Sequence, residues 1–432
     1  MARSPRIRQI FPLLVTLFLV ATAYSDPAQA FHSGGVGDCN GCHSMHRPGM
    51  GEAGTNTGNP ASLAASDPGS TCLNCHLKTG EKRPDSHLVS TEDADMPPGS
   101  PPIQLTPGGD FGWLKKNYQW GAGGGEDGGN SPGDRHGHNI VAVDYRFTSD
   151  TTHTTAFGGT FPTNRLSCIS CHDPHGRYRR FADGSIGMGG TPIHASGSYN
   201  TSPDPTTDRA VGVYRLLGGK GYVTSRYDGV PFTTDPPAVV SPADYNRPEN
   251  QSETRVAYGR GMSEWCANCH SAFLGGGRGA KVHPAGDDVK LSAAVVANYN
   301  AYVASGNLTG SLATAYTSMV PFEMGTTDYA QLKRTAGAIG ASTAGPDTSS
   351  NVMCLSCHRA HASGWDHALR WNTKSEFLVF NGEYPGIEVS GVPARIAGGR
   401  TRAETRRAYY ERPATRFATY QRSLCSKCHA KD

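Results

Sequence analysis

A five-residue pattern, Cys-x-x-Cys-His, occurs six times in this chain and uses all 12 of its cysteines. In this pattern the two cysteine sulfurs can bond covalently to a haem, and the histidine that follows can ligate its iron. We therefore expect six haem c cofactors, attached through Cys39, Cys42, Cys72, Cys75, Cys168, Cys171, Cys266, Cys269, Cys354, Cys357, Cys425 and Cys428. The expected proximal iron ligands are His43, His76, His172, His270, His358 and His429.

Paired cysteines have other uses: they can form disulfides, bind zinc or act as a redox dithiol. None of these uses requires a histidine directly after every second cysteine, and histidine makes up only 17 of the 432 residues. The pattern therefore favours covalent haem attachment over the disulfide and zinc interpretations.

The first 30 residues have the features of an export signal. Arg3, Arg6 and Arg8 precede an apolar stretch at residues 10–23 that is too short to cross a membrane comfortably. The Ala-Gln-Ala sequence at 28–30 then offers a cleavage site. We expect a signal peptide at 1–30 and a single hexahaem domain at 31–432 that is exported from the cytoplasm. The alternative is an uncleaved membrane anchor, and no later stretch is apolar enough to span a membrane.

The composition predicts an unusual fold. Only 37% of the residues are hydrophobic, whereas 54 are glycine and 29 are proline. Such a chain would ordinarily be suspected of disorder, but six porphyrins would supply the buried apolar surface that the side chains lack. We expect a mostly irregular, loop-rich and elongated multihaem cytochrome c with minor short helices, whose core is the chain of haems. The formal net charge of +3 gives no indication of a nucleic acid partner.

Local patterns predict a few regular elements. Helices are expected at 292–305, 328–338, 401–411 and 418–428, and brief strands at 139–147 and 238–240. The glycine-rich residues 121–134 follow no expected strand and are interpreted as a flexible loop, with a calcium site as the remote alternative. The eight arginines in 395–422 are interpreted as partners of haem propionates and local carboxylates, with a docking patch for anionic partners as the alternative.

The second axial ligand of each iron decides the class of protein. Eleven histidines lie outside the motifs and nine methionines are also available, so histidine on both faces of every iron is the favoured arrangement. Such haems leave no open position for a substrate, which predicts an electron carrier rather than an enzyme. A reductase would be expected to leave one haem open.

Three histidines share one local position, three residues after a proximal histidine: His46, His175 and His361. So short a segment cannot pass around the porphyrin edge to the opposite face of the same iron. Each is therefore expected to ligate a neighbouring haem, which would bring the haems close together.

Longer stretches resemble the OmcS-type hexahaem cytochromes, extracellular proteins of metal-reducing bacteria that polymerise into electron-conducting filaments. The resemblance is in register with all six motifs and covers nearly all of 31–432. It is carried by residues 31–36, 93–97, 106–113, 137–141, 171–176, 255–258, 262–270, 283–286, 357–364 and 428–432.

The resemblance implies two histidine ligands at every iron and haems that alternate between parallel and T-shaped contacts. It also implies that His46 ligates the haem held by His358 of the next subunit. The distal candidates that it supports are His32, His46, His87, His138, His175, His283 and His361. One of these seven is surplus for six irons, and His32, near the expected mature N-terminus, is the weakest. The four other histidines, His136, His153, His194 and His367, are expected at the surface.

The function that follows is extracellular electron transfer by a homopolymer assembled head to tail. The expected electron donors are outer-membrane cytochromes, and the expected acceptors are extracellular minerals such as metal oxides, or electrodes. The alternative is a monomeric soluble electron shuttle with the same haems.

Overall fold

The computed structural model describes residues 39–43, 63–77, 87–121, 128–224, 229–242, 255–274, 285–315, 320–337 and 344–429. The expected signal peptide lies outside the described residues, as do three of the distal ligand candidates, His32, His46 and His283.

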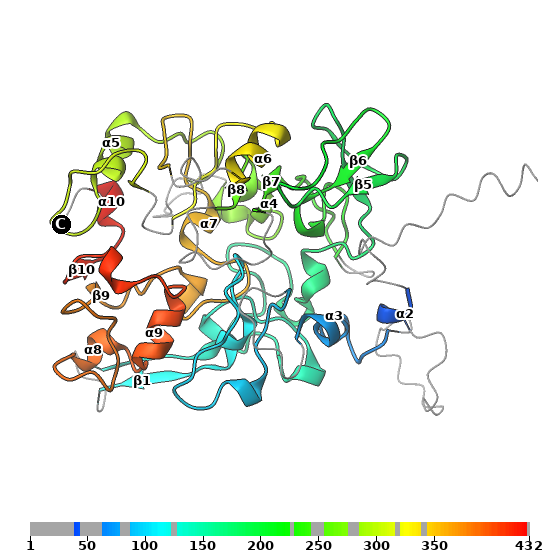
Figure 1. Ribbon diagram of the computed structural model, residues 1–432. Helices are drawn as coiled ribbons and strands as arrows, with labels where there is room; N and C mark the ends of the chain where they lie inside the picture. The colour runs from blue at the N-terminus through cyan, green and yellow to red at the C-terminus, as the bar shows by residue number, and fades with distance from the viewer. Residues whose placement is uncertain are drawn as a thin grey trace, which may run out of the picture.

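Helices in the described part are short, and irregular chain dominates, as the composition predicted (Figure 1). The α-helices are α2 (Cys39–Cys42), α3 (Pro68–His76), α4 (Met262–Cys266), α5 (Ala293–Ala301), α6 (Tyr329–Gly337), α7 (Cys354–Cys357), α8 (Ala394–Ala397), α9 (Arg402–Ala408) and α10 (Ser426–His429). The 3-10 helices are η1 (Asp93–Asp95), η2 (Phe111–Lys115), η3 (Gly133–Arg135), η4 (Val143–Tyr145), η5 (Thr163–Arg165), η6 (Cys168–Ser170), η7 (Tyr214–Leu216), η8 (Ser271–Phe273), η11 (Asp366–Ala368) and η12 (Ala414–Arg416).

The strands are also short. They are β1 (Tyr118–Trp120), β2 (Gly129–Ser131), β3 (Tyr178–Arg180), β4 (Ile186–Met188), β5 (Ile193–Ala195), β6 (Ala210–Gly212), β7 (Val239–Val240), β8 (Ala257–Tyr258), β9 (Phe377–Val379) and β10 (Gln421–Arg422). One sheet has the order β4-β3-β6-β5, in which only the β5–β6 pair is parallel. The pairs β1–β2, β7–β8 and β9–β10 form two-stranded antiparallel sheets.

Three of the four expected helices are confirmed, and side-chain caps explain where they begin. Ser292 caps α5 by accepting from the backbone N–H of Val295, and Thr401 forms a capping box with Glu404 at the start of α9. Asp328 accepts from two backbone N–H groups at the start of α6. In each of these helices, a polar side chain at the N-terminus accepts hydrogen bonds from backbone N–H groups of the first turn.

The expected helix at 418–428 is wrong over its first half. Gln421 is fully buried and its Nε2 donates to Tyr302 Oη at 3.0 Å, while its Oε1 accepts from the backbone N–H of Ser305. These contacts hold Gln421 in β10 against β9, so α10 begins only at Ser426. Tertiary hydrogen bonds here override the local helical preference.

Two other local predictions need correction. The strand expected at 139–147 is absent, because Ala142 and Phe147 pair across the tight turn that contains η4, with Arg146 at a φ of 60°. The glycine-rich stretch 121–134 does follow a strand: β1 precedes it, residues 129–131 form β2, and η3 begins at Gly133. The brief strand at 238–240 is confirmed as β7.

His136 is not a surface residue as predicted. It is fully buried: its Nδ1–H donates to the Trp113 carbonyl at 2.9 Å, and its Nε2 lies 2.8 Å from Ser131 Oγ. The desolvation of the ring lowers its pKa to about 3, so the imidazole is neutral. His153, His194 and His367 are exposed, as predicted.

Arg400 does not belong to a surface patch either. It is buried, with its guanidinium over the rings of Tyr118 at 3.9 Å and Trp365 at 4.6 Å, and it donates to backbone carbonyls and to Ser131. Other arginines of 395–422 pair with nearby carboxylates, as expected: Arg402 with Glu383, Arg406 and Arg407 with Glu411, and Arg422 with Glu376.

The helices that carry the Cys-x-x-Cys-His motifs are distributed from one side of the molecule to the other. Figure 1 shows α2 and α10 at opposite sides, with α3, α4 and α7 between them. Within the described ranges no helix is long and apolar enough to cross a membrane.

Candidate haem-binding sites

Each motif lies in a single helical turn, and this explains its spacing. The backbone N–H of the histidine donates to the carbonyl of the first cysteine, at 2.7 Å for His43 and 3.0 Å for His172 and His358. Residues i, i+3 and i+4 share one face of such a turn. Both cysteines and the histidine therefore present their side chains on the same side, as one covalently attached and ligated haem requires.

The six sites follow one another in sequence order. The Cys72 side chain lies beside that of Cys168, and the Cys266 side chain beside that of Cys354. The remaining junctions are also close enough for electrostatic interaction: Cys42 with Cys72, Cys171 with Cys269, and Cys357 with Cys425. The arrangement is a linear series in which every site adjoins the next.

Four proximal histidines have a second imidazole facing them. The distances between ring centroids are 6.3 Å for His43 and His175, 5.7 Å for His76 and His87, 6.5 Å for His172 and His361, and 6.0 Å for His270 and His138. Two imidazoles that ligate one iron from opposite faces have centroids roughly 6 Å apart, because each metal–nitrogen bond is about 2 Å long. The spacing of the rings therefore fits a haem iron at all four sites.

Backbone carbonyls fix the orientation of most of these rings. The Nδ1–H groups donate from His76 to His87 O, from His138 to Ala360 O, from His172 to Arg215 O, from His270 to Phe157 O and from His358 to His367 O, at 2.7–3.0 Å. A ring that donates through Nδ1 keeps the lone pair of Nε2 for a metal. His87 is the exception, since its Nε2 lies 3.0 Å from Cys75 O and would have to turn to ligate an iron.

Two of the accepting carbonyls belong to residues with a positive φ, a backbone conformation that residues other than glycine rarely adopt. Arg215 and Leu216 have φ values of 50° and 57°, and His367 and Ala368 have 60° and 54°. The residue after each pair, Leu217 or Leu369, then forms a β-bridge with the proximal histidine, His172 or His358. The third and fifth sites are thus built alike, with residues other than glycine held in left-handed backbone beside the proximal histidine. The amino-acid sequence does not reveal these carbonyls, because a backbone acceptor leaves no side-chain signature.

Two of the three histidines at the shared C-x-x-C-H-x-x-H position face other motifs, as expected, and the third, His46, lies outside the described residues. His175 of the third motif faces His43 of the first, and His361 of the fifth faces His172 of the third. His361 also stacks on Phe111 with centroids 4.6 Å apart. Over the part of the chain that the structure describes, no second imidazole pairs with His358.

Comparisons with known proteins find relatives over nearly the whole length of the chain. No family model matches the chain. It is 50% identical over 431 residues to the C-type cytochrome OmcS of Geobacter sulfurreducens, covering 97% of this chain and 99% of that protein. Its structure is similar to the cryo-EM structure of OmcS nanowires from Geobacter sulfurreducens, with a TM-score of 0.84 at 49% identity. It is equally similar to the Outer Membrane Cytochrome S filament from the same organism, with a TM-score of 0.84 at 50% identity. Each match covers 93% of this chain and 100% of the other.

Proposed function

Because this chain belongs to the family of the c-type cytochrome OmcS, we propose that it transfers electrons outside the cell along six haem c groups and that its subunits polymerise head to tail into a filament. Each haem supplies an iron that changes reversibly between two oxidation states. The protein holds six sites in one continuous series, fixes the ligands of each iron and excludes water from part of each site.

The ring pairs support an assignment of axial ligands. His175 serves the iron of His43, His87 that of His76, His361 that of His172 and His138 that of His270. For the two remaining irons the candidates come from the resemblance: His46 of a neighbouring subunit for the iron of His358, and His283 or His32 for that of His429, of which His32 is the weaker.

One observation supports the filament: the first and third motifs each receive a histidine ring from the next odd-numbered motif. The third motif supplies a ring to the first, and the fifth supplies one to the third. If the same step continues, the first motif of the next subunit supplies His46 to the fifth motif of this one. A contact of this kind is heterologous and does not close on itself, so repetition produces a filament.

The chain is secreted after removal of residues 1–30, receives electrons from outer-membrane cytochromes and delivers them to extracellular minerals or electrodes. All six irons have two histidine ligands, so the protein is an electron carrier without a catalytic haem. A monomeric shuttle is the alternative, and assembly state separates the two.

The test is electron microscopy of extracellular protein from cells that express the wild type, His46→Ala or His194→Ala. His194 is exposed and belongs to none of the ring pairs, so its variant controls for the loss of a histidine. We expect filaments from the wild type and the control, and separate subunits from His46→Ala. Single subunits in all three preparations would favour the shuttle, and filaments in all three would remove His46 as the necessary link.

A further inference from the structure

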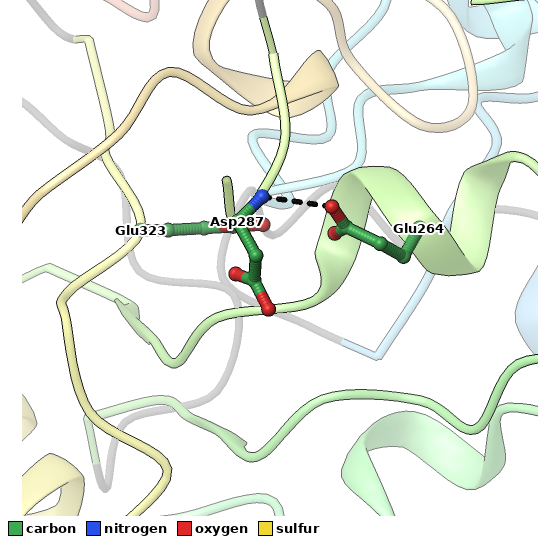
Figure 2. Close-up of side chains that lie close together, drawn as sticks. All are labelled: Glu264, Asp287 and Glu323. Carbon is green, nitrogen blue, oxygen red and sulfur yellow. Dashed lines mark hydrogen bonds between the residues drawn. The ribbon is translucent and has the colours of Figure 1, made fainter. Parts of the chain in front are cut away.

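Three carboxylates from separate segments converge beside the fourth and fifth haem sites. Glu264 lies on α4, Asp287 precedes α5, and Glu323 lies in the segment before α6 (Figure 2). One oxygen from each lies within 4.8 Å of the others. Figure 2 shows the side chains approaching from three directions, with the backbone N–H of Asp287 donating to Glu264 Oε1 at 2.7 Å.

Two buried oxygens of this group have no hydrogen-bond partner among the described residues. Glu264 Oε2 and Asp287 Oδ1 are shielded from solvent and accept no hydrogen bond from this part of the chain. An unpaired carboxylate oxygen in this position carries a substantial desolvation cost. The two oxygens therefore point to a bound ligand at this place.

Glu323 adds a third negative group that is fully enclosed. It is 0% exposed, and its carboxylate accepts from the backbone N–H of Met262 at 2.7 Å and from Asn351 Nδ2 at 2.6 Å. These contacts fix its position rather than neutralise it. Within the described ranges no lysine or arginine forms an ion pair with any of the three carboxylates, and the nearby Lys290 donates to Asn351 Oδ1 instead.

We propose that Glu264, Asp287 and Glu323 bind a divalent cation, and that this cation is calcium. All the donors are carboxylate oxygens, which suit hard cations such as calcium and magnesium and exclude the softer metals that prefer nitrogen or sulfur. Calcium–oxygen distances of about 2.3–2.6 Å let one ion reach donors spread over this distance, and calcium tolerates the irregular geometry that three separate loops provide.

The position suggests what the ion does. Glu264 is two residues before Cys266 of the fourth motif, and Asn351, which binds Glu323, is three residues before Cys354 of the fifth. The ion therefore ties together the two segments that place adjacent haem sites, and it neutralises carboxylates that would otherwise repel one another. Its loss loosens this junction without removing any haem attachment.

The test measures metal binding by the purified, haem-loaded protein. The protein is treated with EGTA, desalted and titrated with calcium chloride, with bound metal counted by mass spectrometry and the melting temperature measured at each step. The variants are Asp287→Asn, with Glu264→Gln as a second, and Glu376→Gln as the control. Glu376 is an exposed carboxylate paired with Arg422 and lies outside the cluster.

We expect one calcium per chain in the wild type and in Glu376→Gln, with a rise in melting temperature on binding. Asp287→Asn and Glu264→Gln are expected to lower calcium affinity by roughly tenfold or more. Their haem absorbance without calcium should match the wild type, which shows that they fold. Absence of stoichiometric binding, or equal binding by the cluster variants, would overturn the site. Preferential binding of magnesium in competition would overturn the assignment to calcium.

Discussion

The imidazoles of His43 and His175 lie parallel, with their planes 6° apart and their centroids separated by 6.3 Å. These residues are far apart in the chain and belong to different motifs. Their relationship suits two ligands on opposite faces of one iron, and in the proposed ligand assignment the first site depends on the third motif for a ligand.

This relationship predicts the effect of His175→Ala. The variant should keep six haems, because all 12 cysteines remain, but one iron should lose a ligand and become high-spin. Electron paramagnetic resonance and reduced-minus-oxidised spectra should assign about one sixth of the haem to the high-spin form. His153→Ala is the control. A fully low-spin spectrum for His175→Ala would show that another residue ligates this iron.

Substitution of Asp110 should have a large effect on the stability of the fold. Its carboxylate is fully buried and accepts from the backbone N–H groups of Thr91, Gln104 and Gly112 and from the Thr91 hydroxyl. The residue adjoins Phe111, whose ring stacks on His361. Asp110→Asn replaces one acceptor oxygen by a donor and should lower the free energy of unfolding by about 3 kcal/mol. Thermal or denaturant unfolding of the haem-loaded protein measures this, and a change below about 1 kcal/mol would contradict the role.

His136 should prove structural. Its ring satisfies the Trp113 carbonyl and contacts Ser131, so His136→Ala leaves buried groups unpaired and should destabilise the fold by about 2–4 kcal/mol. The haem spectrum and the count of low-spin irons should remain unchanged. A high-spin signal in this variant would instead place His136 among the ligands.

Without calcium, the stability of the protein should depend on pH because of the buried carboxylate of Glu323. Burial, with the neighbouring carboxylates adding to it, raises the pKa of Glu323 to about 7 from an ordinary value of 4.5. Since the folded-state pKa is the higher one, the favourable contribution is complete below pH 4.5 and is lost as the pH rises through 7. Its full size is about 3 kcal/mol.

Melting temperatures in EGTA should therefore fall between pH 5 and pH 8, and Glu323→Gln should flatten this fall. Calcium should restore the wild type at pH 8, because the ion stabilises the ionised carboxylates. An equal fall for wild type and variant would assign the pH dependence to other groups.

The sequence predicted where the haems attach, but not which parts of the fold orient the histidine ligands. Cys-x-x-Cys-His spacing located all six sites, and the short link from His172 to His175 indicated that His175 faces another site. The orientation of the rings depends on carbonyls of Arg215 and His367 in left-handed backbone, which no side-chain pattern reveals. His136 was predicted at the surface because a lone histidine in a glycine-rich stretch shows nothing of the tryptophan and serine that bury it.

Tertiary contacts also explain the missed elements. Gln421 looked compatible with a helix, and only its hydrogen bonds to Tyr302 and Ser305 place it in a strand. The carboxylate cluster is likewise invisible in the sequence, because Glu264, Asp287 and Glu323 meet only after three segments have folded together.

The most direct test of the central claim is a cryo-EM map of the filament that shows the iron attached through Cys354 and Cys357. The proposed arrangement predicts His358 on one face of this iron and His46 of the neighbouring subunit on the other. An imidazole from the same chain on that face would contradict the ligand exchange between subunits, and the filament would then need a different joint.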